Sequence, residues 1–257
     1  MHFKLYIHPL CSLCYRIVKR LMMKNLVERV KILSVSTKVE EAIACNVWSV
    51  PWLIINDEYV IPSPISPEEV ENYVKGGFSL QAEYNVDSLL ENFKNAVIYS
   101  LAASAITYLH KSLKPLLNTT FPKIASRIHI LKPELRTKAL NELLQEIGSN
   151  EDKIYSEIED SVIKYLAINF VRERYWLVGD TTGENISKYL VAHWLLAKAT
   201  FGRVGLPYPA PVNLLNNVNE LYSEIVNNYS KYMRSVIFRL NMINRDTKYL
   251  EFISKLA

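Results

Sequence analysis

Two cysteines near the start of the chain have the spacing of a pair that exchanges disulfides. Cys11 follows a short run of alternating apolar residues and opens a segment with helical spacing, and Cys14 comes three residues later. A sulfur at the first turn of a helix lies where unpaired N–H groups and the helix dipole favour an anion, so the pKa of Cys11 should be lowered. Cys14 would lie one turn on, within reach of Cys11. Because exchange runs through a mixed disulfide, we predict that Cys11 attacks and Cys14 resolves.

A proline-containing loop is the second candidate part of this site. Val50 and Pro51 stand directly before the apolar run 52–55. Proline lacks an N–H and disrupts strand pairing, so the segment predicts a constrained loop and is a candidate for a cis peptide bond. We expect this loop to lie beside Cys11. The N–H and C=O of Val50 could then pair with an incoming peptide or thiol ligand as an added strand.

The elements that must position these residues form an α/β domain over residues 1–77. Strands joined by helices are expected to pair in parallel, whereas the two-residue turn at 56–57 indicates a hairpin. Ser66 would cap the last helix, which has proline in its first turn. The order βαβαββα therefore predicts a four-stranded mixed sheet with helices on its faces. The strands are predicted at 3–7, 30–35, 52–55 and 58–61, and the helices at 11–24, 37–45 and from Ser66.

The remainder, residues 78–257, shows no strand pattern and predicts an all-α domain. One irregular segment, the Gly- and Pro-rich run 202–211, is a candidate lid or partner loop, although an ordinary surface connection has the same composition. The predicted helices are 86–112, 134–147, 151–177, 184–201, 213–240 and 246–256.

Composition excludes several classes of protein. The chain has 257 residues, 49% hydrophobic and 22% charged, which excludes a disordered, collagen-like or disulfide-rich chain. Its formal net charge of +4 is spread along the sequence, which argues against a nucleic-acid partner. Three cysteines make no disulfide framework, and the first seven residues lack the pattern of a secretory leader, so we expect a cytoplasmic protein. The apolar run 95–109 has about 15 residues rather than the roughly 20 that span a bilayer, so we expect a core helix and no membrane partner.

Taken together, these motifs resemble a known superfamily. The segments 4–7, 11–14 and 49–57, in the order βαβαββα, are similar to the thioredoxin/glutaredoxin superfamily over residues 1–77. Further along, residues 176–186 are similar to the glycine turn and N-capping box of the glutathione-transferase helical domain. The whole chain thus resembles the two-domain glutaredoxins that carry a glutathione-transferase-like helical half.

This resemblance implies a nucleophile at Cys11, a resolving thiol at Cys14 and a cis-proline loop at Val50–Pro51. It also implies a capping box at Thr182 and Asn185, which would stabilise a helix and carry no chemistry. No cofactor is expected to be bound permanently. Glutathione or another low-molecular-weight thiol is the expected co-substrate, and a homodimer is left open.

The sequence departs from the family pattern at two places. Ser12 and Leu13 stand between the cysteines, where the family commonly has proline or glycine, so its redox potential does not transfer. The glycine pair and acid that hold glutathione are replaced by the segment 61–66. Ser66, at a helix N-terminus, could still bind a carboxylate. The identity of the thiol co-substrate is therefore open.

Other donors near the cysteines have competing interpretations. His8 precedes Cys11 by three residues and could stabilise the thiolate as an imidazolium, or could simply satisfy a carbonyl at the end of a strand. A zinc site would need His2, His8 or Cys45 as further ligands, and redox chemistry is preferred over it and over an iron–sulfur cluster shared in a dimer. We therefore expect no metal. Cys45 itself is interpreted as a small buried hydrophobe.

Polar residues in the helical half are interpreted as structural. His193 and Trp194 lie in an apolar helix and are expected in the core. Arg172 and Arg174 lie on a long helix and are expected on a solvated face.

The sequence is compatible with three functions. The favoured one is a thiol–disulfide oxidoreductase that acts on a protein or small-molecule disulfide. The first alternative is a glutathione-transferase-like enzyme that conjugates or binds small thiols in a cleft between the domains, for which Cys14 would be dispensable. The second alternative is a non-catalytic binding module on the same fold.

Overall fold

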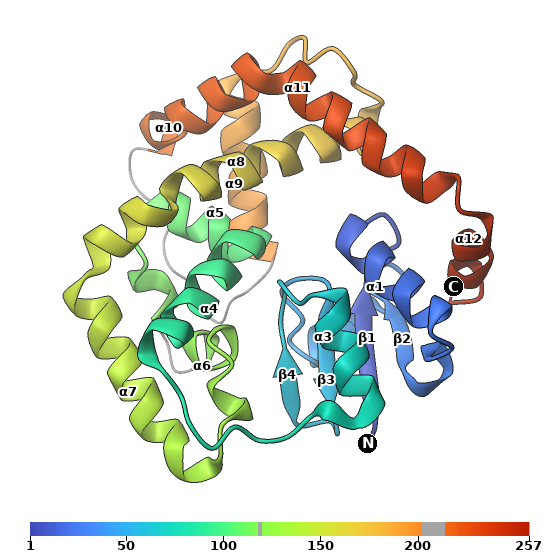
Figure 1. Ribbon diagram of the computed structural model, residues 1–257. Coiled ribbons are helices and arrows are strands. Elements are labelled where there is room, and N and C mark those ends of the chain that lie inside the picture. The colour runs from blue at the N-terminus through green and yellow to red at the C-terminus, as the bar shows by residue number, and fades with distance from the viewer. Residues whose placement is uncertain (118–119, 202–213, 257) are drawn as a thin grey trace.

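The computed structural model describes residues 1–117, 120–201 and 214–256 (Figure 1). The segment 202–211, predicted as a lid or partner loop, lies outside the described residues. A small mixed sheet is formed near the N-terminus, and the rest of the described chain is helical. The predicted combination of an α/β part and a helical part is therefore present.

The sheet contains four strands in the spatial order β2-β1-β3-β4. β1 pairs in parallel with β2, whereas β3 runs antiparallel to both β1 and β4. The expectation that all strands joined by helices pair in parallel is therefore wrong for β3. The reason is that residues 45–51 follow the helix after β2 and give the chain room to reverse before it joins the free edge of β1. The strands are β1 (Phe3–Ile7), β2 (Lys31–Ser34), β3 (Trp52–Ile55) and β4 (Tyr59–Ile61).

Helices alternate with these strands in the predicted order. One face of α1 is apolar at helical spacing and is buried through Cys14, Ile17, Val18 and Leu21. This face packs on the side of the sheet that carries alternate residues of β1, namely Phe3, Leu5 and Ile7. The helices are α1 (Ser12–Met23), the 3₁₀ turn Val27–Arg29, α2 (Val39–Ala44) and α3 (Pro67–Asn72), which continues into a π turn at Tyr73–Gly77.

The helical half lies to the left of the sheet and above it in Figure 1, and α12 lies on the right, beyond β2. Its helices α4, α5, α8, α9 and α11 form a core that also takes Tyr6, Trp52 and Ile54 from the second face of the sheet. In Figure 1, α11 crosses the top of the molecule and the chain returns in α12 beside α1. The longer elements are α4 (Val86–Tyr99), α5 (Leu101–His110), α7 (Pro133–Ser149), α8 (Glu151–Val178), α9 (Lys188–Phe201), α11 (Asn219–Asn244) and α12 (Thr247–Ser254). The shorter ones are the 3₁₀ turns Lys114–Leu116 and Ile128–Ile130, α6 (Phe121–Ala125) and α10 (Leu214–Asn217).

Serine side chains set two helix boundaries that differ from the predicted ones. The predicted helix 86–112 is interrupted at Ser100, which has extended backbone angles and whose hydroxyl accepts the N–H of Ala103 at 3.4 Å. The predicted helix 184–201 begins at Lys188 instead, with the Ser187 hydroxyl accepting the N–H of Leu190 at 3.2 Å. A hydroxyl that caps new N–H groups allows a helix to start there, although the apolar pattern continues across it.

The capping box predicted at Thr182 and Asn185 is not formed. The Asp180 carboxylate instead accepts the N–H groups of Thr182 and Gly183, at 3.0 and 2.9 Å, and fixes the turn after α8. Asn185 has a left-handed backbone before α9 begins. Thus an aspartate outside the predicted box provides the polar contacts of this turn.

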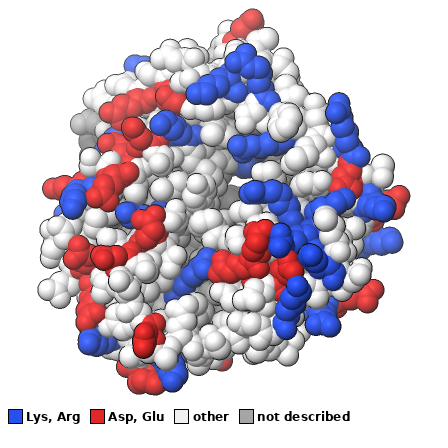
Figure 2. Space-filling view, viewed as in Figure 1, with Lys and Arg blue, Asp and Glu red and all other residues white. Residues whose placement is uncertain are grey.

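Figure 2 shows side chains of both charge signs on one face of the molecule. Acidic groups are more frequent over the helical left side of this view, and basic groups are more frequent on the right. No helix of the described residues has both the length and the apolar character to cross a membrane.

A buried histidine joins the helical half to the edge of the sheet. The Nε2 atom of His129 accepts the backbone N–H of Val60, in the edge strand β4, at 2.8 Å. Its Nδ1 lies 3.4 Å from the carbonyl oxygen of Lys123. Burial lowers the pKa of His129 to about 4. The neutral ring therefore satisfies the edge N–H that would otherwise lack a strand partner.

Because the pKa of His129 is lowered, we predict that the protein loses stability at mildly acidic pH. The unfolded chain takes up a proton at about pH 6.5, whereas folded His129 resists protonation down to about pH 4. Neutral His129 makes its full contribution to the free energy of unfolding above about pH 6.5. As the pH falls from there toward about pH 4, this contribution is lost at about 1.4 kcal/mol per pH unit. His129→Gln should remove this part of the pH dependence, measured by urea unfolding between these values. His193→Gln, at an exposed site on α9, should keep it, and equal slopes in wild type and His129→Gln would contradict the assignment.

Candidate active site

Cys11 lies at the junction of β1 and α1, where it is the N-cap residue of the helix. Its backbone is extended, and its Sγ accepts the N–H of Cys14 at 3.3 Å. Its own N–H donates to the carbonyl oxygen of His8 at 3.0 Å. Sulfur thus occupies the place that the oxygen of a serine or aspartate takes at most helix starts, and it faces the unpaired N–H groups there. The predicted location of the first cysteine is confirmed.

The two thiols of the pair have opposite electrostatic environments. The pKa of Cys11 is lowered to about 7, chiefly because the Cys14 thiol donates to its sulfur, and the N–H groups of Cys14 and Leu13 and the charge of Arg172 act in the same direction. Burial opposes this shift. Cys14 is fully buried, and burial raises the pKa of its thiol well above the usual value. Both cysteines are in the free thiol form. One sulfur is therefore suited to be an anion, and the second stays protonated beside it.

The loop before β3 lies against Cys11, as the sequence predicts. The Val50–Pro51 peptide bond is cis. The Cys11 thiol faces the carbonyl oxygen of Val50, with 3.9 Å between sulfur and oxygen. Val50 is half-buried and Pro51 is buried. The tertiary structure therefore joins two motifs that are about 40 residues apart in the sequence.

His8 lies near the site, and its surroundings favour a neutral ring over the imidazolium that was one of its two interpretations. Its ring stacks on Trp176 of α8, with ring centres 5.3 Å apart and planes within 9°. Its Nδ1 accepts the N–H of Leu10 at 3.2 Å. Burial first, and then the positive charge of Arg172, lowers the pKa of His8. The ring is neutral near pH 7, because a buried imidazole beside a cation loses its proton more easily.

The two arginines of α8 are not on a solvated face, contrary to the expectation. Arg174 is half-buried and pairs with Asp180 at 2.6 Å. Arg172 is half-buried and stacks over the ring of Trp176, with its guanidinium carbon 4.7 Å from the ring centre. Arginine and tryptophan four residues apart on one helix share a face, so the spacing of Arg172 and Trp176 was a signal for this contact.

The two residues of α9 interpreted as core have different environments. His193 is exposed, so its predicted core position is wrong. Trp194 is half-buried, and its indole N–H donates to Glu173 at 2.9 Å. The apolar pattern of α9 therefore does not bury every bulky residue, because part of the helix faces outward.

The end of the chain also contacts the cysteine loop. The hydroxyl of Tyr249, on α12, donates to the carbonyl oxygen of Pro9 at 2.9 Å, and the side chain is fully buried. Asp246 accepts the hydroxyl of Tyr15 at 2.9 Å and pairs with Lys19, both on α1. The sequence contains no local signal for these contacts, because the partners are more than two hundred residues apart.

Ser66 and Cys45 lie in other parts of the α/β half. The hydroxyl of Ser66 caps α3 by accepting the N–H of Glu69 at 3.0 Å, and Glu68 and Glu69 add negative charge to that turn. Carboxylate binding at Ser66 stays a prediction, and these two acids act against it. Cys45 is half-buried and accepts the Tyr6 hydroxyl at 3.1 Å. No group of three metal-binding side chains occurs among the described residues.

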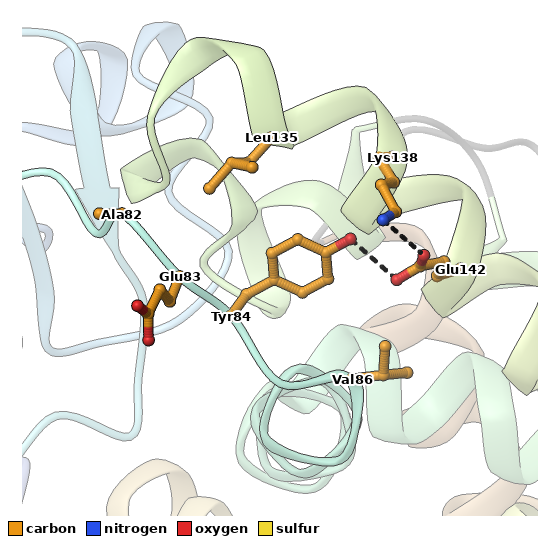
Figure 3. A pocket seen from close by; sticks show the side chains of 7 residues that line it. All are labelled: Ala82, Glu83, Tyr84, Val86, Leu135, Lys138 and Glu142. Carbon is orange, nitrogen blue, oxygen red and sulfur yellow. Dashed lines mark hydrogen bonds and ion pairs between the residues drawn. The ribbon is translucent and has the colours of Figure 1, made fainter.

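A hollow elsewhere on the surface is not part of this site. It lies between the linker before α4 and the start of α7 and is lined by residues of both segments (Figure 3). Three of its polar groups contact each other, since the Tyr84 hydroxyl donates to Glu142 at 2.8 Å and Lys138 lies 3.8 Å from the same carboxylate. The cysteine pair is the better candidate for an active site because the pKa of its Cys11 thiol is lowered to about 7.

A search of protein-family models, curated proteins and solved structures found no match to this chain.

The lowered pKa of Cys11 predicts fast alkylation at neutral pH. Cys14 is buried, so a Cys45→Ser variant leaves Cys11 as the thiol that reacts. Its alkylation rate should rise with pH and reach half its maximum near pH 7. A free thiol would do so at about 8.5. The rate is measured with iodoacetamide as a function of pH.

A matched pair of variants tests the cause of this shift. Cys14→Ser keeps a hydroxyl donor to the Cys11 sulfur, whereas Cys14→Ala removes it, so the half-maximal pH should move upward more in the alanine variant. Equal curves for the two variants would show that the side chain at position 14 does not set the pKa of Cys11.

Proposed function

We propose that this protein is a thiol–disulfide oxidoreductase in which Cys11 is the nucleophile and Cys14 the resolving thiol. The observation that carries the proposal is the position of the Cys11 sulfur at the start of α1, with the N–H of Cys14 at 3.3 Å and a buried second thiol one turn on. Hydrogen bonds from the Cys14 thiol and from the N–H groups of Cys14 and Leu13 lower the pKa of Cys11 and so supply a thiolate at neutral pH. Only the thiolate attacks a disulfide.

The reaction proceeds in two exchange steps. The Cys11 thiolate attacks one sulfur of the substrate R–S–S–R′, forming a Cys11–S–S–R bond and releasing R′–S⁻, which takes a proton. Cys14 then gives up its proton and attacks the Cys11 sulfur, releasing R–S⁻ and leaving a Cys11–Cys14 disulfide. The substrate gains two electrons and the protein loses them. A low-molecular-weight thiol or a dithiol protein returns the two electrons and restores both thiols.

The burial of Cys14 delays the second exchange step until the first is complete. Cys14 is fully enclosed and its pKa is raised, so it is a poor nucleophile until Cys11 carries a disulfide. Once the Cys11 sulfur is part of a mixed disulfide, it is no longer an anion that accepts the proton of Cys14. Cys14 then needs only a short movement to attack this sulfur. The backbone of Val50, whose carbonyl faces the Cys11 sulfur, gives an extended ligand a place to pair.

The proposal includes a protein or small-molecule disulfide as substrate, with glutathione as one candidate reductant. A reducing compartment such as the cytoplasm would keep the pair as free thiols, the form present in the structure.

Single-turnover experiments without an added reductant test the proposal. Reduced wild-type protein mixed with a small aromatic disulfide should end with a Cys11–Cys14 disulfide and two equivalents of released thiol. Cys14→Ser should stop at a mixed disulfide on Cys11, with one equivalent released, and Cys11→Ser should release none. Intact-mass spectrometry and absorbance of the released thiol measure these outcomes.

Cys45→Ser is the control, since Cys45 contacts Tyr6, and it should behave as wild type. Turnover by Cys11→Ser at the wild-type rate would eliminate the proposal. Conjugation of a thiol to an electrophile that does not depend on Cys14, without any disulfide exchange, would favour the transferase alternative.

A further inference from the structure

Three consecutive charged residues on α8 have different surroundings. Glu173 pairs with Lys198 at 2.6 Å and accepts the indole N–H of Trp194. Arg174 pairs with Asp180 at 2.6 Å. Arg172, between α8 and the cysteine loop, has no carboxylate partner among the described residues, and its buried Nε has no hydrogen-bond acceptor there. One of three neighbouring charges is thus left uncompensated.

Ring contacts link Arg172 to the cysteine loop. The guanidinium of Arg172 lies over the ring of Trp176, and the same ring stacks in parallel with the ring of His8. The carbonyl of His8 in turn accepts the N–H of Cys11 at 3.0 Å. The indole N–H of Trp176 is also buried without an acceptor among the described residues. The helical half therefore contributes a cation and an unpaired donor beside the cysteine loop.

A half-buried guanidinium without a counter-ion is costly, because burial removes water from a charge that cannot be lost by deprotonation. Such a charge is usually compensated by a carboxylate, and the planar guanidinium holds a carboxylate through two parallel hydrogen bonds. The described residues offer no carboxylate to Arg172. Its charge acts on the sulfur of Cys11, whose pKa it helps to lower, and an anion that arrives with the substrate would be a further partner.

We propose that Arg172 is a substrate-binding residue that holds a carboxylate close to the scissile disulfide, so that the preferred substrates are disulfides bearing an acidic group near sulfur. This inference rests on the proposed exchange reaction and names its substrate class. The carboxylate lies on the half of the substrate that becomes joined to Cys11. Arg172 thereby orients the disulfide toward the Cys11 sulfur, and the ring of Trp176 supports the guanidinium.

The test compares two disulfides of equal length, 3,3′-dithiodipropionate and its uncharged bis-amide. Reduction is followed with an excess of a dithiol reductant, at a pH well above the pKa of Cys11, so that the thiolate population is the same in every variant. Wild type should have a higher kcat/KM for the diacid. Arg172→Gln should lower the ratio of kcat/KM for the diacid to kcat/KM for the bis-amide by about 10- to 100-fold, the range of a charge-assisted hydrogen bond. Arg172→Lys, which keeps the charge without the two-point geometry, should fall between them.

Arg174→Gln is the matched control, because Arg174 has the same charge and helix but pairs with Asp180. Its ratio should equal that of wild type, even if its stability is lower. An equal loss for both substrates in Arg172→Gln would overturn the proposal and show that Arg172 acts only on the Cys11 sulfur. The absence of any reduction of either disulfide by wild type would instead reject the exchange reaction, so the two failures are distinguishable.

Discussion

The hydrogen bonds that the thiol and the N–H of Cys14 make to the sulfur of Cys11 are the interactions on which the proposed exchange depends. A helix must begin somewhere, and its first N–H groups have no partner within the helix. Most proteins satisfy them with an oxygen. Here a sulfur takes that place, so the same contact that starts α1 also stabilises the negative charge that the proposed exchange requires. Helix formation and a part of the lowered pKa of Cys11 therefore share this contact.

The two halves of the chain share this site. The α/β half contributes the cysteines and the Val50 carbonyl, while α8 contributes Trp176 and Arg172. A helix as long as α8, residues Glu151–Val178, can pack its middle in the helical core and still place its last turns beside the cysteine loop. The charge near the thiol therefore comes from a distant part of the sequence. His8, although adjacent in sequence, contributes a neutral ring, because burial and the arginine both favour loss of its proton.

The C-terminal segment contacts the loop between β1 and α1, next to Cys11. Tyr249 holds the carbonyl of Pro9, and Asp246 binds Tyr15 and Lys19 on α1. The loop between β1 and α1 is thus fixed by the last elements of the chain, and the apolar core of the α/β half includes Ile243 and Tyr249. A division at residue 77 describes the order of elements along the sequence. In space, the end of the helical half belongs to the packing of the first half.

The sequence by itself determined the elements around the cysteines, because period-2 and helical spacing, proline and N-cap signals are local. It located Cys11 at a helix start and indicated the cis Val50–Pro51 loop from residue types alone. Tertiary structure decided the direction of β3 and the environments of Arg172 and His8. These features depend on which distant surfaces meet: the pKa of a side chain and the counter-ion of an arginine follow from neighbours in space, which spacing along the chain does not specify.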